Sequence, residues 1–348
     1  MVTRYDRLKQ IQRLDPERDF LEIYRLTVTY EFPWDITRAL EFALYRTYAV
    51  PSIGRLLAQT AELTERPQKR YDDTALLLDA VVEHGFDSEM GRTAIRRINR
   101  MHRSYDISND DMRYVLCTFV VTPKRWLDAY GWRKLSDHEL RAFAAYYRAL
   151  GAHMGISDVP QTYGDFERTL DSYEAENFGW DQGGRQVSDA TFALMGSWYP
   201  AALAPVVRKA GLALLDDSLL RAFRYERPGP VARGLTRGVL RLRGRAVRLL
   251  PPRTTAHYAR QNPEIKGYPD GYDIAGLGTF PTPGPAAARS RTAGLSVPRA
   301  SDLESRGSGP PPEVLTARLR SPGRRGPGSG RPRRRTTGPA TPNARTTG

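Results

Sequence analysis

The chain has 348 residues and a formal net charge of +14, but its composition changes sharply near residue 281. Residues 281–348 contain thirteen arginines and three acidic residues, so this segment holds ten of the fourteen net positive charges. Most of the positive charge therefore lies in this C-terminal segment. The net charge is for that reason weak evidence that residues 1–280 bind nucleic acid.

The segment 281–348 is also rich in Pro, Gly and Ser and contains no aromatic residue. Such a composition buries too little apolar surface to offset the entropy of ordering the backbone, so we predict a disordered tail. Its RPRRR cluster has the charge to contact nucleic acid or anionic lipid. A solvated tail without a dedicated partner is the simpler interpretation.

A single cysteine, Cys117, excludes an internal disulfide bond and is typical of a reducing compartment. The first 20 residues are charged throughout and lack the apolar core of a secretory signal. The longest uncharged stretch, residues 190–207, is interrupted by Gly and Pro and falls short of the ~20 apolar residues that span a bilayer. We therefore predict a cytoplasmic protein in which this stretch is a buried core segment.

Helix signals begin near residue 33 and recur along the body. Residues 33–50 carry apolar side chains at helical spacing, and Asp35 is placed to cap this helix. Asp72 and Asp73 suit the first turn of another helix, because their carboxylates meet the unpaired N–H groups there. Gly85 suits the C-terminal end of that helix.

The next predicted helix starts at Ser88 and runs to about Arg103. Its inward face is formed by residues at i, i+4, i+7 and i+11, which are Gly91, Ile95, Ile98 and His102. Arginines line a different side of the helix, at positions 92, 96, 100 and 103. Such a stripe usually pairs with carboxylates, although haem propionates or nucleic acid would also suit it.

Further helix signals follow as far as residue 250. Ser108 opens a helix that we expect Pro123 to close, and Ser136 with Glu139 forms a capping-box pattern. Helical patterns also cover residues 163–177, 188–198, 201–224 and 231–250, whereas residues 26–30 alternate only weakly as a strand would. The body is therefore predicted to be all-α.

The composition and the helix signals together predict three parts. They are a helical domain at residues 1–252, an irregular extension at 253–280 and the disordered tail at 281–348.

Chemistry-bearing motifs are scarce, and this directs attention to the histidines. The chain has no HExxH or paired CxxC zinc motif, no Gly-rich phosphate loop and no recognisable Ser or Cys nucleophile. The five histidines are at positions 84, 102, 138, 153 and 257. By their positions in the predicted helices, only His102 and His153 are candidate ligands or catalytic residues. A structural role is favoured for His153, because its neighbours are small and helix-terminal.

His102 is distinguished by the residues that we expect to face it. Arg70 and Thr74 are four residues apart, so they share a helix face. At ~1.5 Å per residue, Thr74 lies about 16 Å from the turn at Gly85 and His102 lies about 21 Å from Ser88. An antiparallel hairpin therefore places all three side chains at the same end.

This arrangement suits a haem group. A neutral imidazole coordinates iron from one side, and a guanidinium and a hydroxyl on the other side can hydrogen-bond to dioxygen as it gains negative charge. Helices at their usual axis separation of ~8 to 10 Å leave no room for a porphyrin, so we expect this pair to splay apart.

The same residues lie within longer segments that resemble the haem-dependent oxygenases of the MpaB type and the latex-clearing rubber oxygenases. The matching segments lie between residues 31 and 167 and include FPWDITRALEFALYRTYAVPSI, KRYDDTALLL, RRINRMHRSYDISNDDMRYVLCTFVVTPKRWLDAYGWRKL and GAHMGISDVPQTYGDF. Their order and spacing are specific when they occur together.

The resemblance implies a single globin-like helical core that holds haem b, with His102 as the proximal iron ligand and Arg70 and Thr74 on the distal side. It implies oxygen-dependent cleavage of a carbon–carbon double bond in an isoprenoid or similar apolar substrate. One departure concerns Asp73, because rubber-cleaving members can have Lys immediately before the Thr. The resemblance is therefore closer to the MpaB-like branch, and rubber is not the expected substrate.

Other interpretations stay open at this point. A haem protein of this kind can act as a sensor or carrier instead of an enzyme, and the basic tail can act on nucleic acid, although no specific nucleic-acid partner is expected. Residues 231–250 place Leu235, Val239, Leu242, Ala246 and Leu249 on one side of a helix among many arginines. This pattern fits equally a peripheral contact with an anionic membrane and a terminal helix packed on the core.

Overall fold

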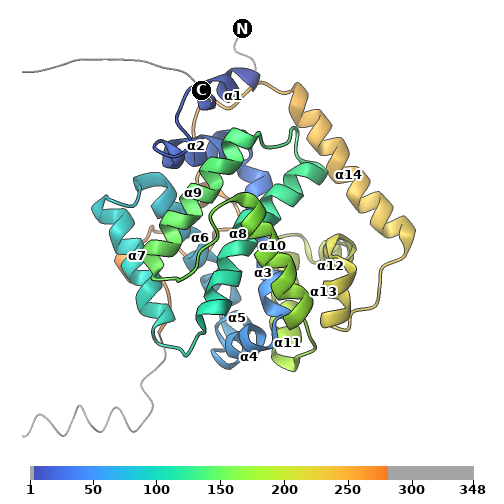
Figure 1. Ribbon diagram of the computed structural model, residues 1–348. Coiled ribbons are helices and arrows are strands. Elements are labelled where there is room, and N and C mark those ends of the chain that lie inside the picture. The colour runs from blue at the N-terminus through green and yellow to red at the C-terminus, as the bar shows by residue number, and fades with distance from the viewer. Residues whose placement is uncertain (1–3, 281–348) are drawn as a thin grey trace, which may run out of the picture. The chain divides into compact units, whose positions relative to one another are not determined.

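The computed structural model describes residues 4–280 (Figure 1), so the predicted disordered tail at 281–348 lies outside the described residues. The described part contains fourteen α-helices and no strand, which confirms the all-α prediction. The helices are α1 (Arg4–Ile11), α2 (Phe20–Leu26), α3 (Pro33–Tyr48), α4 (Pro51–Gln59), α5 (Glu62–Glu65), α6 (Pro67–His84), α7 (Glu89–His102), α8 (Asn109–Tyr130), α9 (Asp137–Met154), α10 (Tyr163–Asn177), α11 (Gln182–Ser197), α12 (Ala204–Leu214), α13 (Asp217–Ala222) and α14 (Pro230–Leu249).

The predicted serine caps are confirmed. The Ser88 hydroxyl accepts a hydrogen bond from the Gly91 amide at 2.9 Å, and the Ser108 hydroxyl accepts one from the Asp111 amide at 3.0 Å. Ser136 and Glu139 form a capping box at the start of α9. Each cap satisfies N–H groups that the first turn of a helix leaves without a partner.

The acidic caps predicted for the earlier helices are wrong. Prolines at positions 33 and 67 begin α3 and α6, because the fixed φ of proline suits the first helical position and its missing N–H costs nothing there. Asp72 and Asp73 consequently lie in the second turn of α6, where both are buried. Asp35 lies inside α3, and its carboxylate accepts hydrogen bonds from Arg243 at 2.8 Å.

Pro123 does not close its helix, which continues to Tyr130. The residues beyond the proline, Trp126 and Leu127, are buried in the core, so packing holds the last turns despite the lost hydrogen bond. Residues 27–31 form a π-helix instead of a weak strand, and residues 201–224 divide into a 3₁₀ turn, α12 and α13.

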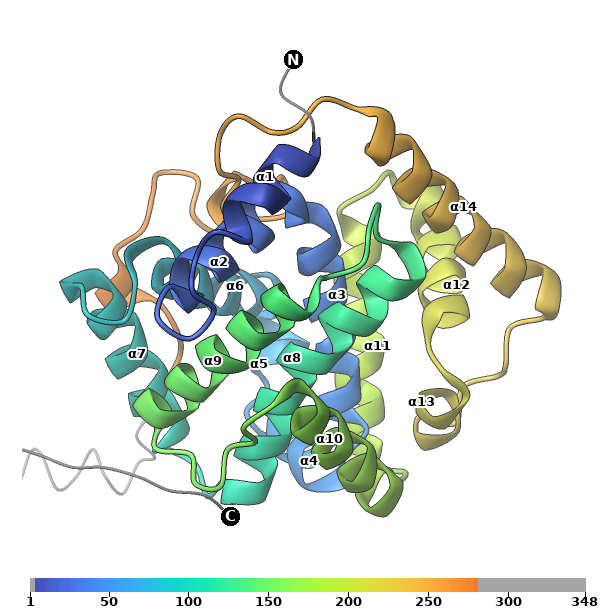
Figure 2. The ribbon, with the colours of Figure 1, turned by 45° about the horizontal axis from the view of Figure 1, so that its top comes forward.

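Helix α8 is central to the packing, because it contacts α3, α9, α10 and α14 (Figure 2). The main core lies around it and is rich in aromatic side chains, including Phe32, Tyr114 and Phe143. A second cluster lies between α3, α11 and α13 and includes Tyr45 and Phe223. None of the helices between residues 4 and 280 is long and apolar enough to cross a bilayer.

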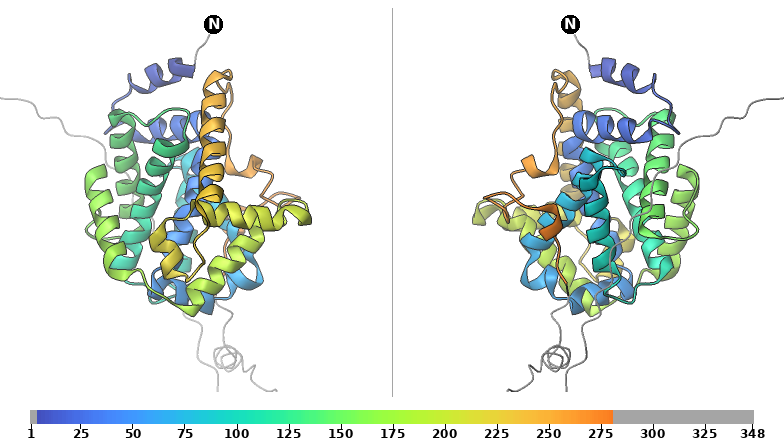
Figure 3. Two further views of the ribbon diagram at one scale, coloured as in Figure 1. Left: turned by 90° about the vertical axis from the view of Figure 1, so that its right-hand side faces the viewer. Right: turned by 90° about the vertical axis from the view of Figure 1, so that its left-hand side faces the viewer.

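After α14 the chain returns across α6 and α7. We call residues 257–280 the C-terminal strap; its regular structure within the described range is two single 3₁₀ turns, Ala259–Gln261 and Ile274–Gly276. Ile274 and Leu277 are buried in the main core, and the Leu277 carbonyl accepts a hydrogen bond from Arg97 of α7. Figure 3 (right) shows this orange segment beside α7.

Candidate active site

Helices α6 and α7 form a hairpin that is tight at its turn. Gly85 ends α6 with a positive φ of 80°, which glycine adopts without strain. A Cβ atom on Gly91 would lie 1.8 Å from the Gly85 carbonyl oxygen, so the sequence must keep a glycine there for α7 to approach the turn. Arg70 and Thr74 lie toward the other end of α6, and His102 is the last residue of α7.

The imidazole of His102 carries a buried nitrogen without a hydrogen-bond partner. Nδ1 is buried and has no partner among the residues that the structure describes. Burial and, after it, the positive charge of Arg70 lower the pKa of His102 to about 4. The ring is therefore neutral at pH 7 and presents a lone pair, which is the form that ligates a metal.

The other four histidines are placed differently. His138 and His257 each have Nε2 at 2.8 Å from an oxygen, which belongs to the Leu14 carbonyl and to the Asn262 side chain respectively. His84 lies 3.7 Å from a Glu83 carboxylate oxygen. His153 is exposed at the end of α9, where its ring stacks on Phe86 at 5.0 Å.

The structure brings Arg70 and Thr74 together and places Arg70 near His102. The Arg70 guanidinium donates to the Thr74 hydroxyl, which in turn donates to the Arg70 carbonyl at 2.8 Å. Arg66 and Lys69 pair with Glu62 and Asp73, whereas Arg70 makes no ion pair within residues 4–280. Its charge is therefore free to act on His102 and on whatever lies between α6 and α7.

Two tyrosines near Arg70 were not predicted from the sequence. Burial raises the pKa of Tyr48 to about 12, and the charge of Arg70 acts in the opposite direction. The buried Tyr48 hydroxyl lies near Thr191 without hydrogen-bond geometry, so it has no partner among the described residues. Burial also raises the pKa of Tyr105. The negative charge of Glu62 raises this pKa further, and the positive charge of Arg70 lowers it.

Buried polar atoms without partners are uncommon in folded proteins. Eight buried side-chain atoms lack one within the described range, and His102 Nδ1, Tyr48 Oη and a carboxylate oxygen of Glu62 are three of them. His102 and Tyr48 interact electrostatically with Arg70, and Glu62 is linked to it through Tyr105. These atoms mark a polar site, and no spacing in the sequence pointed to Tyr48 or Glu62.

Comparison with known proteins identifies the family. Residues 38–249, more than half of the chain, match the family described as "ER-bound oxygenase mpaB/B'/Rubber oxygenase, catalytic domain". The chain belongs to this family. The match covers α6, α7 and the residues placed around Arg70, and it ends before the C-terminal strap begins.

Two relatives of this mpaB/rubber oxygenase family member come from Penicillium. The ER-bound oxygenase mpaB' of Penicillium brevicompactum is 31% identical over 245 residues, which cover 65% of this chain and 58% of that protein. The ER-bound oxygenase mpaB of Penicillium roqueforti (strain FM164) is 30% identical over 251 residues, which cover 64% of this chain and 84% of that protein. The chain thus spans less than two thirds of mpaB' and most of the second relative.

The residues present fit a haem group by their chemistry. His102 offers a neutral imidazole with a buried unpartnered nitrogen, and Arg70 and Thr74 offer donors from the neighbouring helix. This set matches one axial ligand and a facing group of hydrogen-bond donors. The roles of these three residues, and the predicted splay of α6 from α7, stay predictions.

Asp73, the residue before Thr74, is engaged by the C-terminal strap. Its side chain is fully buried, lies 2.6 Å from Lys69 Nζ and accepts a hydrogen bond from the Tyr268 hydroxyl. Asp72 beside it accepts hydrogen bonds from the Lys266 and Gly267 amides. In this family member the two aspartates therefore fix the strap to the helix that carries Arg70.

The contact between the strap and Asp73 gives a prediction about stability. Tyr268→Phe removes a donor from a buried carboxylate, and we expect the free energy of unfolding to fall by about 1 to 3 kcal/mol. Denaturant unfolding followed by circular dichroism measures this change. Tyr199→Phe is the control, because Tyr199 is 45% exposed; equal stability of both variants would contradict the assignment.

A buried carboxylate next to the site gives a prediction about pH. The Glu41 carboxylate accepts a hydrogen bond from Tyr71 at 2.7 Å and lies 3.0 Å from Arg38, yet burial raises the pKa of Glu41 from 4.5 to about 7. The folded protein therefore holds this proton more tightly than the unfolded chain. The stability from this group is complete below pH 4.5 and is lost as the pH rises through 7.

The variant Glu41→Gln cannot titrate at this position. Relative to wild type, its free energy of unfolding should improve by up to ~3 kcal/mol as the pH rises from acidic to neutral. Chemical denaturation at a series of pH values measures the difference between the two proteins. A difference that does not change with pH would show that Glu41 has the same pKa in the folded and unfolded states.

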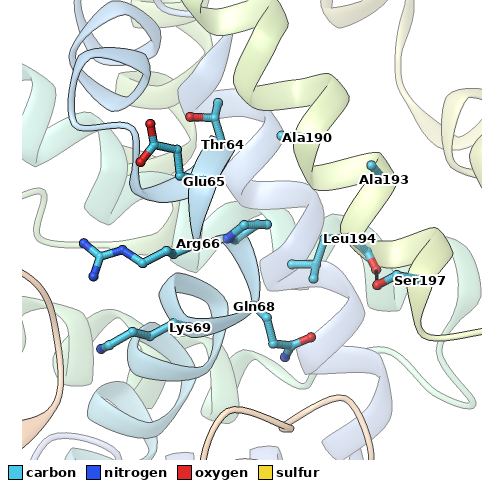
Figure 4. Close-up of a pocket in the computed structure, with 10 residues that line it drawn as sticks. Thr64, Glu65, Arg66, Gln68, Lys69, Ala190, Ala193, Leu194 and Ser197 are labelled. Carbon is cyan, nitrogen blue, oxygen red and sulfur yellow. Dashed lines mark hydrogen bonds between the residues drawn. The ribbon is translucent and has the colours of Figure 1, made fainter.

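A surface pocket of about 470 Å³ lies beside the candidate site (Figure 4). It is lined by the end of α5, the first turn of α6 and one side of α11, and it includes Gln68, Ala190 and Leu194. Arg66 and Lys69 extend away from α11 in this view. Neither Arg70, Thr74 nor His102 lines this pocket, so it is separate from the polar site around Arg70.

Proposed function

We propose that this chain is a haem b-dependent oxygenase that uses dioxygen to cleave a carbon–carbon double bond in an apolar, isoprenoid-like substrate. The observation that carries the proposal is the buried, unpartnered Nδ1 of a neutral His102 within reach of the Arg70 charge. Membership of the mpaB/rubber oxygenase family and the oxygenase names of both relatives support it.

Each residue of the site has a stated task in this proposal. His102 would hold the haem iron through its imidazole, which its low pKa keeps unprotonated at neutral pH. Haem b supplies the iron chemistry with dioxygen that no side chain provides. Arg70 would donate hydrogen bonds toward oxygen atoms that gain negative charge, and the Thr74 hydroxyl would do so after turning from the Arg70 carbonyl that it now meets.

The overall reaction balances without an external reductant. One carbon–carbon double bond and one dioxygen molecule give two carbonyl groups, so both oxygen atoms enter the products. The task left to the chain is to stabilise charge, which the proposal assigns to Arg70 and Thr74. The apolar nature of the substrate rests on the family resemblance, and Asp73 in place of Lys favours a substrate other than rubber.

Reconstitution tests the cofactor and the activity separately. The full chain is purified, titrated with haem b and followed by its Soret band, which should saturate at one haem per chain. Oxygen consumption is then measured with a panel of isoprenoid alkenes, and carbonyl products are identified by mass spectrometry. Saturable haem binding without oxygen uptake or carbonyl products would favour the sensor or carrier function, whereas no stoichiometric haem binding would refute the proposal.

A further inference from the structure

Helix α14 carries an apolar stripe that points away from the rest of the described structure. Its members are between 57% and 87% exposed, and they are Val231, Leu235, Val239, Leu242 and Leu249. Their spacing places them on one side of the helix. Figure 1 shows α14 at the right-hand edge of the helices. A run of exposed aliphatic side chains of this length marks an interaction surface.

The orientation of α14 is fixed by its other side. Gly244 packs against the end of α8, where a Cβ atom would lie 2.4 Å from the Tyr130 carbonyl oxygen. Leu240 and Val247 pack against the main core, and Arg243 pairs with the buried Asp35 at 2.8 Å. The helix therefore cannot rotate to bury the stripe without breaking these contacts.

The surroundings of the stripe are strongly positive. Between Glu226 and Glu264 the sequence contains nine arginines and no acidic residue. Arg241, Arg245 and Arg248 are exposed and lie next to the stripe by helical spacing. These three make no ion pair with any residue that the structure describes, whereas Arg233 and Arg243 are paired with aspartates.

We infer that α14 is a membrane-binding helix that lies in the plane of an anionic lipid surface, with the apolar stripe inserted among the acyl chains. Apolar side chains that partition into the interface and arginines that meet lipid phosphates are the two components of such binding. The arginines and the apolar stripe together favour an anionic membrane over a second copy of the chain or a nucleic acid. A second copy placed symmetrically on the stripe would set arginines against arginines, and a nucleic acid gives no role to exposed leucines.

The inference is independent of the α6–α7 site, so its test uses vesicle binding and not activity. Full-length protein is mixed with vesicles of phosphatidylcholine containing about 30% phosphatidylserine, or with phosphatidylcholine alone, and bound protein is separated by flotation. We expect binding to the anionic vesicles that the double variant Leu235→Ser with Leu242→Ser weakens about 10-fold or more. Met90→Ser is the matched control, because Met90 is 47% exposed on α7.

Insertion can be read directly with a polarity-sensitive dye. The sole cysteine, Cys117, is fully buried, so a cysteine introduced by Leu242→Cys can be labelled selectively in the folded protein. We expect a blue shift of the dye at this position when anionic vesicles are added, and no shift for the same dye attached through Met90→Cys.

Two results would overturn the inference. Vesicle binding that survives the double serine variant, with no dye shift at position 242, would assign lipid binding to another part of the chain, such as residues 281–348. Conversion of a dimer to a monomer by the double variant in the absence of lipid would assign the stripe to contact between copies. Binding of a duplex DNA probe that the double variant abolishes would count equally against a lipid partner.

Discussion

His102→Ala should abolish stable haem binding, with a loss of at least ~100-fold in affinity for haem b. The variant removes the neutral imidazole that we propose as the axial ligand and replaces it with a methyl group that cannot coordinate iron. The fold should be preserved, because the imidazole nitrogen that is lost makes no hydrogen bond within the described residues. Haem titration followed by the Soret band, with circular dichroism of the apoprotein, measures both effects.

His153→Ala is the matched control for this variant. His153 is an exposed histidine whose ring stacks on Phe86, so its removal should leave haem stoichiometry and affinity unchanged. Added imidazole should restore a ligated haem spectrum to His102→Ala by entering the space that the ring occupied. A Soret band and affinity equal to those of wild type in His102→Ala would contradict the axial assignment.

Arg70→Ala should retain haem but lower the rate of oxygen consumption about 100-fold. Within residues 4–280 the guanidinium makes no ion pair and donates to Thr74, so its charge remains available for oxygen atoms that become negative. Arg70→Lys should recover part of the rate, because it restores the charge without the planar set of donors. The measurement is oxygen uptake with a cleaved alkene at equal haem occupancy.

The same variant has a second readout that does not depend on activity. The positive charge of Arg70 lowers the pKa of His102, so this pKa should rise in apo Arg70→Ala. An NMR titration of the His102 ring protons measures the change. Arg96→Ala is the control, because Arg96 is exposed on the outer side of α7. An unchanged pKa together with an unchanged rate would place Arg70 outside the site.

The sequence alone predicted an all-α body and the starts of α7, α8 and α9. Ser88, Ser108 and Ser136 cap helices as predicted, because a serine hydroxyl satisfies free N–H groups through contacts only two or three residues away. Periodicity also placed His102 on the inward side of α7, next to Ile98 and in line with Ile95. These features depend on local spacing, which the sequence records directly.

Only the tertiary structure decided the partners of the polar residues. Asp35, Asp72 and Asp73 read as helix caps, but each is buried against a segment that comes more than 190 residues later in the chain. The strap that binds Asp72 and Asp73 has almost no regular structure. Its sequence therefore has no periodic pattern from which its contacts with α6 could be predicted. Long-range pairing of this kind is set by packing and cannot be read from spacing.

The same division applies to the site and to α14. Spacing suggested that Arg70, Thr74 and His102 share one end of a hairpin, but Tyr48 and Glu62 come from α3 and α5 and join them only through the fold. The pattern of α14 gave an apolar side with arginines, yet it fitted burial and exposure equally. The contacts of Gly244 and Arg243 decided the matter, because they hold the opposite side of the helix against α8 and α3 and leave the leucines facing outward.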